Sequence, residues 1–162
     1  MLSAQALSDH VEIAQLVQRY GKALDEKDYA LLDTVFTSDA VTNYDLGTLG
    51  NRTTYAQMRA LFERFNAVFS FTSHLLSAPL VELDGDSATA ETRLVATHGL
   101  ERVGGEKSAW FVIGFYRDRL VRTVSGWRIA ERAFHGLHTI GELPPASELK
   151  TFERPFWSRS PR

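Results

Sequence analysis

Apolar residues recur at intervals of three and four through most of the first seventy positions, which is the period of amphipathic helices. The first helix is predicted to start at Ser8, because Asp9 and Glu12 form a capping-box pattern there. A short second helix is predicted to open at Asp28 as its N-cap and to end in the turn-rich segment 37–40. A third run keeps the helical period through Tyr55, Met58, Leu61, Phe62 and Phe65.

From about residue 70 the pattern becomes strand-like, as it is in the short segment 41–47 that precedes the third helix. Two such runs are joined by the Asp-Gly-Asp sequence at 84–86, which suits a hairpin turn. The segment 108–123 is apolar at both parities, which predicts a central strand covered on both faces, and 125–138 predicts the last strand. Helices grouped before an antiparallel sheet define an α+β fold. A sheet curved around those helices would leave a pocket.

The chain has 162 residues, which fits a single domain with one main site. We expect this domain to span residues 1–140. The segment 141–162 contains four prolines, which disfavour regular structure, and also Phe152, Phe156 and Trp157. This C-terminal tail is therefore expected to dock, either over the pocket or on a neighbouring subunit.

Composition narrows the possible partners and chemistry. The formal net charge is −2 with Lys and Arg dispersed along the chain, so a nucleic-acid partner is not expected. No targeting segment and no membrane-spanning run is recognised, which predicts a soluble, cytoplasmic protein with no membrane partner. The chain has no cysteine, which excludes disulfides, thiolate nucleophiles and Cys-type zinc sites. Chemistry would then depend on His, carboxylate, Tyr, Ser, Lys or Arg side chains.

Two histidines fall on predicted buried faces. His74 shares a face with Leu76, and His98 lies in phase with the apolar parity of the segment 88–100, so both imidazoles could face one cavity. The alternative is that each is an ordinary core histidine. A carboxylate would hold the tautomer of a buried imidazole and stabilise its protonated form, and Asp25 is the candidate because it follows the apolar face of the first helix. Asp25 could equally be a solvated helix-end residue.

His135 and His138 lie close together near the end of the last predicted strand. Two histidines without a third ligand are a weak metal signal. The chain also has no Gly-rich phosphate loop and no nucleophile-elbow motif. We therefore expect no metal and no cofactor at the site.

Three segments, 13–41, 74–98 and 126–135, together resemble the SnoaL-like branch of the nuclear transport factor 2-like superfamily. The resemblance runs from about Leu7 to His138. It implies a curved antiparallel sheet wrapped around a long helix, forming a cone that encloses a hydrophobic pocket. It also implies association into a homodimer or homotrimer.

Within that superfamily the chain looks most like the lyase subgroup of scytalone dehydratase, bile acid 7α-dehydratase and hexachlorocyclohexane dehydrochlorinase. The resemblance implies a catalytic Asp25–His74 dyad, with Tyr20, Tyr44 and His98 as further site residues. His74, oriented by Asp25, would remove a proton. Tyr20 and Tyr44 would stabilise the enolate, and His98 would protonate or bind the departing hydroxyl.

The sequence also departs from the subgroup. Leu24 stands where scytalone dehydratase has a tyrosine, and no basic residue follows His135, because the next residue is Gly136. The predicted function is a cofactor-independent lyase that acts on a small, apolar, cyclic or polyketide- or steroid-like substrate. The alternatives are an isomerase or aldol-type cyclase with the same base, or a non-catalytic ligand-binding or assembly module.

Overall fold

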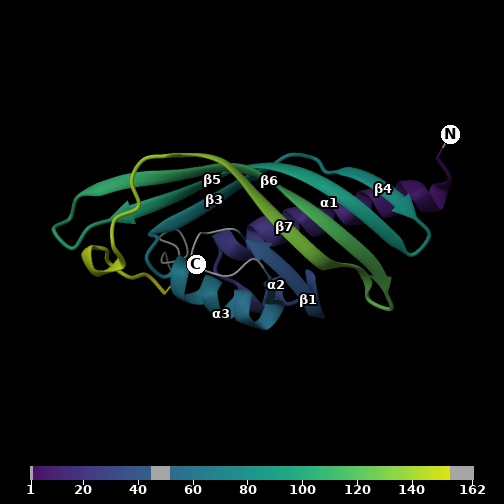
Figure 1. Ribbon diagram of the computed structural model, residues 1–162, viewed down its shortest axis with the longest axis horizontal. Helices are drawn as coiled ribbons and strands as arrows, with labels where there is room; N and C mark the ends of the chain where they lie inside the picture. The colour runs from purple at the N-terminus through teal and green to yellow at the C-terminus, as the bar shows by residue number, and fades with distance from the viewer. Residues whose placement is uncertain (1, 45–51, 154–162) are drawn as a thin grey trace, which may run out of the picture.

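The computed structural model describes residues 2–44 and 52–153 (Figure 1). Its helices are α1 (Ala4–Asp25), α2 (Tyr29–Leu32), α3 (Tyr55–Asn66) and the short 3-10 helix η1 (Ala146–Glu148). Its strands are β1 (Phe36–Tyr44), β2 (Thr53–Thr54), β3 (Phe71–Leu76), β4 (Leu80–Asp84), β5 (Ser87–Glu101), β6 (Lys107–Thr123) and β7 (Gly126–Ile140). The predicted α+β class is confirmed. Within these residues, none of the helices is long and apolar enough to cross a membrane.

The sheet is mixed and open. Its strand order is β2-β1-β7-β6-β5-β3, and β4 also pairs with β5. The long strands β5, β6 and β7 arch over α1 and α3 (Figure 1). The prediction of an antiparallel sheet is wrong at one pair, because β1 runs parallel to β7. A parallel pair needs a long connection, and here α3 and the intervening strands provide it.

The inner face of the sheet packs against the helices. In β5 the alternate residues from Ala88 to Leu100 are buried, as predicted. The hairpin before β5 is also confirmed, with Gly85 at a φ of 59°, a value that glycine adopts without strain. The strand β6 is central, but Arg117 and Arg119 on its outer face are exposed, so the predicted cover on both faces is wrong.

The helix α1 starts four residues earlier than the pattern suggested. It begins at Ala4, and the Ser3 side chain caps it. The predicted start at Ser8 is wrong because Asp9, taken as part of a local cap, lies buried inside the helix. Its carboxylate accepts two hydrogen bonds from Arg122 of β6, each of 2.8 Å. Asp9, which was predicted to lie at the start of the helix, instead forms an ion pair with a distant strand.

The corner between the first two helices and β1 agrees only in part with the prediction. Asp28 caps α2, as expected. The segment 37–40 is not a turn but part of β1, which pairs with β7 on both sides of an irregularity between Phe36 and Val41. The predicted strand at 41–47 is confirmed up to residue 44, beyond which it lies outside the described residues.

The segment after β7 packs against its own chain as far as the structure describes it. Leu149 and Phe152 are both buried, and Leu149 belongs to a small apolar cluster around Phe69. Phe156 and Trp157 lie outside the described residues. Docking of the tail on a neighbouring subunit stays a prediction.

Candidate active site

Asp25 and His74 meet where α1 passes the edge strand β3. His74 Nδ1 lies 2.6 Å from Asp25 Oδ1, and the backbone N–H of His74 donates to Asp25 Oδ2 over 2.9 Å. An ionised carboxylate can only accept hydrogen bonds, so Nδ1 carries the hydrogen in this contact. The Nε2 atom of the neutral ring is then left with a free lone pair, as a general base requires.

The two members of this pair face different spaces. The side chain of His74 is 7% exposed and that of Asp25 is 21% exposed. His74 lines an inner cavity between the sheet and the helices. Asp25 lies behind it, against a surface groove beside α1 that His74 also reaches. The imidazole thus stands between the cavity and its carboxylate partner.

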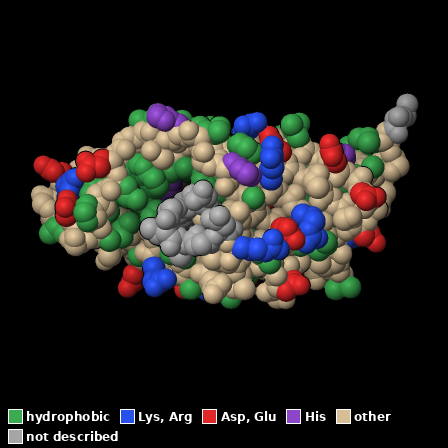
Figure 2. All heavy atoms as spheres, viewed as in Figure 1, with side chains coloured by type: hydrophobic (Ala, Val, Ile, Leu, Met, Phe, Trp, Pro, Cys, Tyr) green, Lys and Arg blue, Asp and Glu red, His purple; other side chains and the backbone are tan. Residues whose placement is uncertain are grey.

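The inner cavity is small and mostly apolar. Its volume is about 70 Å³, well below the roughly 300–1,000 Å³ of most small-molecule sites. Figure 2 shows hydrophobic side chains gathered below one end of the sheet. The lining residues are Tyr20, Leu24, Tyr44, Leu61, Phe62, Phe65, Asn66, His74, Leu94, Ala96, His98, Trp110, Val112, Tyr116 and Phe134. Of the five predicted site residues, four line this cavity and Asp25 supports one of them.

Three tyrosine hydroxyls form a buried cluster in the cavity wall. The hydroxyl oxygens of Tyr20 and Tyr44 are 2.8 Å apart, and those of Tyr20 and Tyr116 are 3.4 Å apart. Burial raises the pKa of Tyr44 and of Tyr116 well above the ordinary value of a phenol. The Tyr44 and Tyr116 hydroxyls therefore stay protonated and can donate hydrogen bonds. Sequence analysis missed Tyr116, although it lies in register with the inward residue Thr92 of β5.

A buried ion pair lies behind the tyrosines and was also missed. Arg132 of β7 donates from Nε and Nη2 to the two carboxylate oxygens of Asp118 of β6, each over 2.7 Å. The Arg132 guanidinium carbon lies 4.1 Å from the ring centroids of both Tyr20 and Tyr116. Among the described residues, Arg132 Nη1 has no hydrogen-bond partner.

One sequence signal could have revealed this pair. Asp118 has the same parity as the buried residues Tyr116 and Leu120, so its carboxylate needed a buried partner. A register irregularity in the β6–β7 pairing hides Arg132 from a simple parity count. No basic residue follows His135, but Arg132 lies three positions before it in the same strand.

His98 lies opposite Trp110 and close to the dyad. Its Nδ1 is 3.3 Å from the Trp110 carbonyl oxygen, and its ring centroid is 6.1 Å from that of His74. Burial is the main cause that lowers the pKa of His98 to about 4, and repulsion from His74 adds to it. Near neutral pH the ring is neutral, with the Nδ1 hydrogen directed at the carbonyl. Its Nε2 can then accept a hydrogen bond rather than supply a proton.

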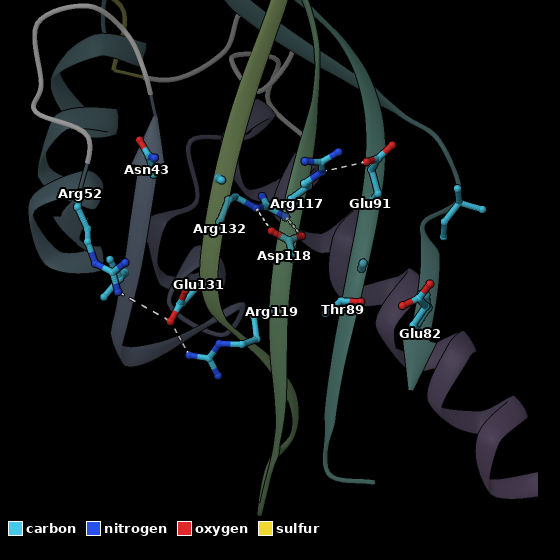
Figure 3. Close-up of a pocket in the computed structure, with 15 residues that line it drawn as sticks. Asn43, Arg52, Glu82, Thr89, Glu91, Arg117, Asp118, Arg119, Glu131 and Arg132 are labelled. Carbon is cyan, nitrogen blue, oxygen red and sulfur yellow. Dashed lines mark hydrogen bonds and ion pairs between the residues drawn. The ribbon is translucent and has the colours of Figure 1, made fainter. Parts of the chain in front are cut away.

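The outer face of the sheet carries a larger depression of different chemistry. This outer trough has a volume of about 1030 Å³, and Figure 3 shows it lined by charged side chains of several strands. Arg117 pairs with Glu91, and Glu131 lies between Arg52 and Arg119. Arginines and carboxylates that neutralise one another offer little to a reacting centre, so the inner cavity is the better candidate site.

His135 and His138 also belong to the outer face. His135 is exposed and stacks on Phe115, with ring centroids 4.7 Å apart. His138 is exposed and lies opposite Ile113 in the β6–β7 pairing. Neither residue lines the inner cavity.

The fold and the site together define the class of this protein, an α+β domain with an open, curved sheet and a part-buried His–Asp pair beside a small apolar cavity. Comparison with known families identifies the class: the model of the SnoaL-like domain matches residues 5–133. The chain therefore belongs to the SnoaL-like family. An uncharacterized relative from Mycobacterium tuberculosis, Rv2910c, is 35% identical over 133 residues, covering 82% of this chain and 88% of the relative.

Solved structures agree on the fold. The Kfla4162 protein of Kribbella flavida is 28% identical, with a TM-score of 0.76 over 83% of this chain and 95% of that protein. A candidate scytalone dehydratase from Novosphingobium aromaticivorans has a TM-score of 0.73 over 93% of this chain and 94% of its own. At 19% identity that second likeness shows the fold alone. Members of this fold include dehydratases and isomerases, which makes catalysis a question for the site itself.

Proposed function

We propose that the protein is a cofactor-independent lyase that eliminates water from a small, mostly apolar, cyclic hydroxy ketone or a similar compound. One observation carries the proposal: the 2.6 Å contact between Asp25 and His74 orients an imidazole that lines a small apolar cavity. An oriented base of this kind contributes about 10²–10⁴ in rate.

In the first step His74 Nε2 removes a proton from the carbon next to a substrate carbonyl. The electron pair of the broken C–H bond moves toward the carbonyl oxygen, which becomes an enolate. Each hydroxyl of the hydrogen-bonded pair Tyr20 and Tyr44 has one hydrogen, so one of them donates to that oxygen and the other donates to the first. Tyr20 is itself stacked on the Arg132 cation, which favours the negative charge. Asp25 stabilises the imidazolium that forms.

In the second step the enolate collapses, a carbon–carbon double bond forms and the bond to the β-hydroxyl breaks. The proton held by His74 passes to the departing oxygen, so one water leaves and the base is regenerated. His98 accepts a hydrogen bond from the same hydroxyl in the bound substrate. The resemblance implied that His98 either protonates or binds the departing hydroxyl, and the lowered pKa of His98, which keeps the ring neutral near pH 7, supports binding.

An isomerase or aldol-type cyclase shares the first step and differs only in where the enolate reacts. A non-catalytic binding module is favoured by a different observation, the cavity volume of about 70 Å³. A cavity of that size must widen before it admits a ring. Movement of the aromatic side chains that line it would supply the space.

The test uses a panel of cyclic β-hydroxy ketones and mass spectrometry of the products. A lyase yields a product lighter by one water, whereas an isomerase yields a product of unchanged mass. His74→Ala lowers turnover by about 10²-fold or more. The matched control is His135→Ala, a histidine on the outer face, which keeps wild-type turnover. Unchanged turnover by His74→Ala would refute the assignment.

A further inference from the structure

We propose that Thr72 is a positioning residue, whose hydroxyl holds the Asp25 carboxylate in the orientation that directs His74. This inference rests on the proposed function. Thr72 is not among the residues that line the cavity, and it contacts no reacting atom in that mechanism. It acts through Asp25.

The geometry around Thr72 directs its hydroxyl hydrogen to Asp25. Thr72 Oγ1 lies 3.0 Å from Asp25 Oδ1, and its other acceptor, the Leu24 carbonyl oxygen, is farther away at 3.4 Å. The residue is 1% exposed. Water cannot readily replace a partner at that depth, so the hydroxyl either bonds to Asp25 or remains poorly satisfied. A charged acceptor is also the stronger of the two.

Asp25 therefore receives three donors from one strand. Oδ1 accepts from Thr72 Oγ1 and His74 Nδ1, and Oδ2 accepts from the His74 backbone N–H. The torsion that turns a carboxylate about its last carbon–carbon bond is soft, so a single hydrogen bond leaves its plane poorly defined. Donors on both oxygens fix that plane, and Thr72 secures the oxygen that faces the imidazole.

Strand geometry explains why residue 72 fills this role. Residues two apart on a strand point to the same face, so the Thr72 and His74 side chains both reach the end of α1. Thr72 also lies opposite His98 in the β3–β5 pairing. A β-branched residue suits the strand, but valine would suit it equally well. Valine lacks the hydroxyl that Thr72 directs to Asp25.

The test is proton NMR of the His74 Nδ1–H, which is expected far downfield because it bonds to a carboxylate. In Thr72→Val the resonance moves upfield and broadens, because Asp25 Oδ1 loses the second donor that holds it against the imidazole. Thr72→Ser restores it, since serine keeps the hydroxyl. The control is Thr89→Val on the outer face of β5, which leaves the resonance unchanged. With a substrate in hand, Thr72→Val lowers kcat about tenfold or more and leaves KM near its wild-type value.

The outcomes separate this inference from the proposed function. A wild-type resonance that disappears in Asp25→Asn but stays unmoved in Thr72→Val overturns the role of Thr72 and leaves the dyad intact. A wild-type protein without any Asp25-dependent resonance overturns the dyad itself. If Thr72→Val does not fold, Thr72→Ala removes the same hydroxyl without the added methyl group, and the same criteria apply.

Discussion

At the residue scale, Asp25 shows why one carboxylate in a charged stretch can be special. Glu26 and Asp28 come from the same stretch; Glu26 is the C-cap of α1 and Asp28 the N-cap of α2. Asp25 alone reaches β3, where it also satisfies a backbone N–H of the edge strand. The Asp25 side chain therefore accepts a hydrogen bond from the backbone of β3 and also orients the His74 ring.

The depressed pKa of His98 predicts how stability depends on pH. The folded protein holds His98 neutral down to about pH 4, while the unfolded chain takes up a proton near pH 6.5. The unfolded state therefore binds more protons between these values, and this contribution to stability is present above about pH 6.5 and lost as the pH falls toward 4. Its size is on the order of 3 kcal/mol.

Urea denaturation of the wild type and of His98→Gln, from pH 4 to pH 8, checks this expectation. The difference in unfolding free energy between the two proteins should shrink as the pH falls. A difference that stays constant over that range would show that His98 titrates normally in the folded protein.

The sequence predicted four of the residues that line the cavity and the contact of Asp25 with His74, but not the side chains that support them. The parity of β5 placed His98 inward, and the resemblance paired Asp25 with His74. Thr72 and Arg132 escaped notice because their roles depend on contacts made across the fold. A threonine in a strand, or an arginine next to a glutamate, has an ordinary appearance in a sequence.

At the element scale, α1 is anchored at both ends. Its C-terminal end meets β3 through Asp25, and its N-terminal half is tied to β6 and β7 through Asp9. That carboxylate binds Arg122 and also accepts from the Trp127 indole over 3.2 Å. The hydrogen bonds from Arg122 hold the pKa of Asp9 well below the usual range. This N-terminal clamp keeps α1 aligned under the sheet.

Asp9→Asn should therefore destabilise the protein by several degrees in Tm, because the partly buried Arg122 loses its charged acceptor. The matched control is Asp86→Asn, which changes the other carboxylate that pairs with Arg122. The Asp86 side chain is 84% exposed, and exposed pairs contribute little. Calorimetry of both variants checks the expectation, and equal shifts in Tm would contradict it.

The element boundaries show where a sequence pattern is insufficient. The period of α1 and the alternation in β5 were correctly interpreted, because a buried face imposes a repeat on many residues. The start of α1 and the strand at 37–40 were predicted wrongly, because the first depends on the Asp9–Arg122 ion pair and the second on the pairing of β1 with β7. The residues that determine these two boundaries lie more than eighty positions away along the chain.

At the scale of the whole molecule, the outer face of the sheet carries apolar residues beside the outer trough. Leu75, Val95 and Ile113 lie side by side on β3, β5 and β6, and Phe111 and Ile140 form a neighbouring row. Leu75 is 74% exposed. We propose that a second copy of the chain covers this face, since the trough offers both arginines and carboxylates to a matching surface.

Ile113→Glu should therefore shift the protein toward monomer in sedimentation velocity, because a charge replaces an apolar contact. The control is Val124→Glu in the turn between β6 and β7, where the side chain is fully exposed and the added charge meets solvent. A wild-type protein that sediments as a monomer would contradict the proposed association. The predicted homodimer and homotrimer would differ in mass in the same experiment.

The central claim is that Asp25 and His74 together act as a base toward carbon acids in the cavity. The most direct measurement is NMR of α-hydrogen exchange in D₂O, with a cyclic ketone that fits the site and lacks a leaving group. We predict that the wild type and His135→Ala catalyse the exchange, and that Asp25→Asn and His74→Ala lower it by about 10²-fold or more. Exchange at the wild-type rate in either dyad variant would contradict the account.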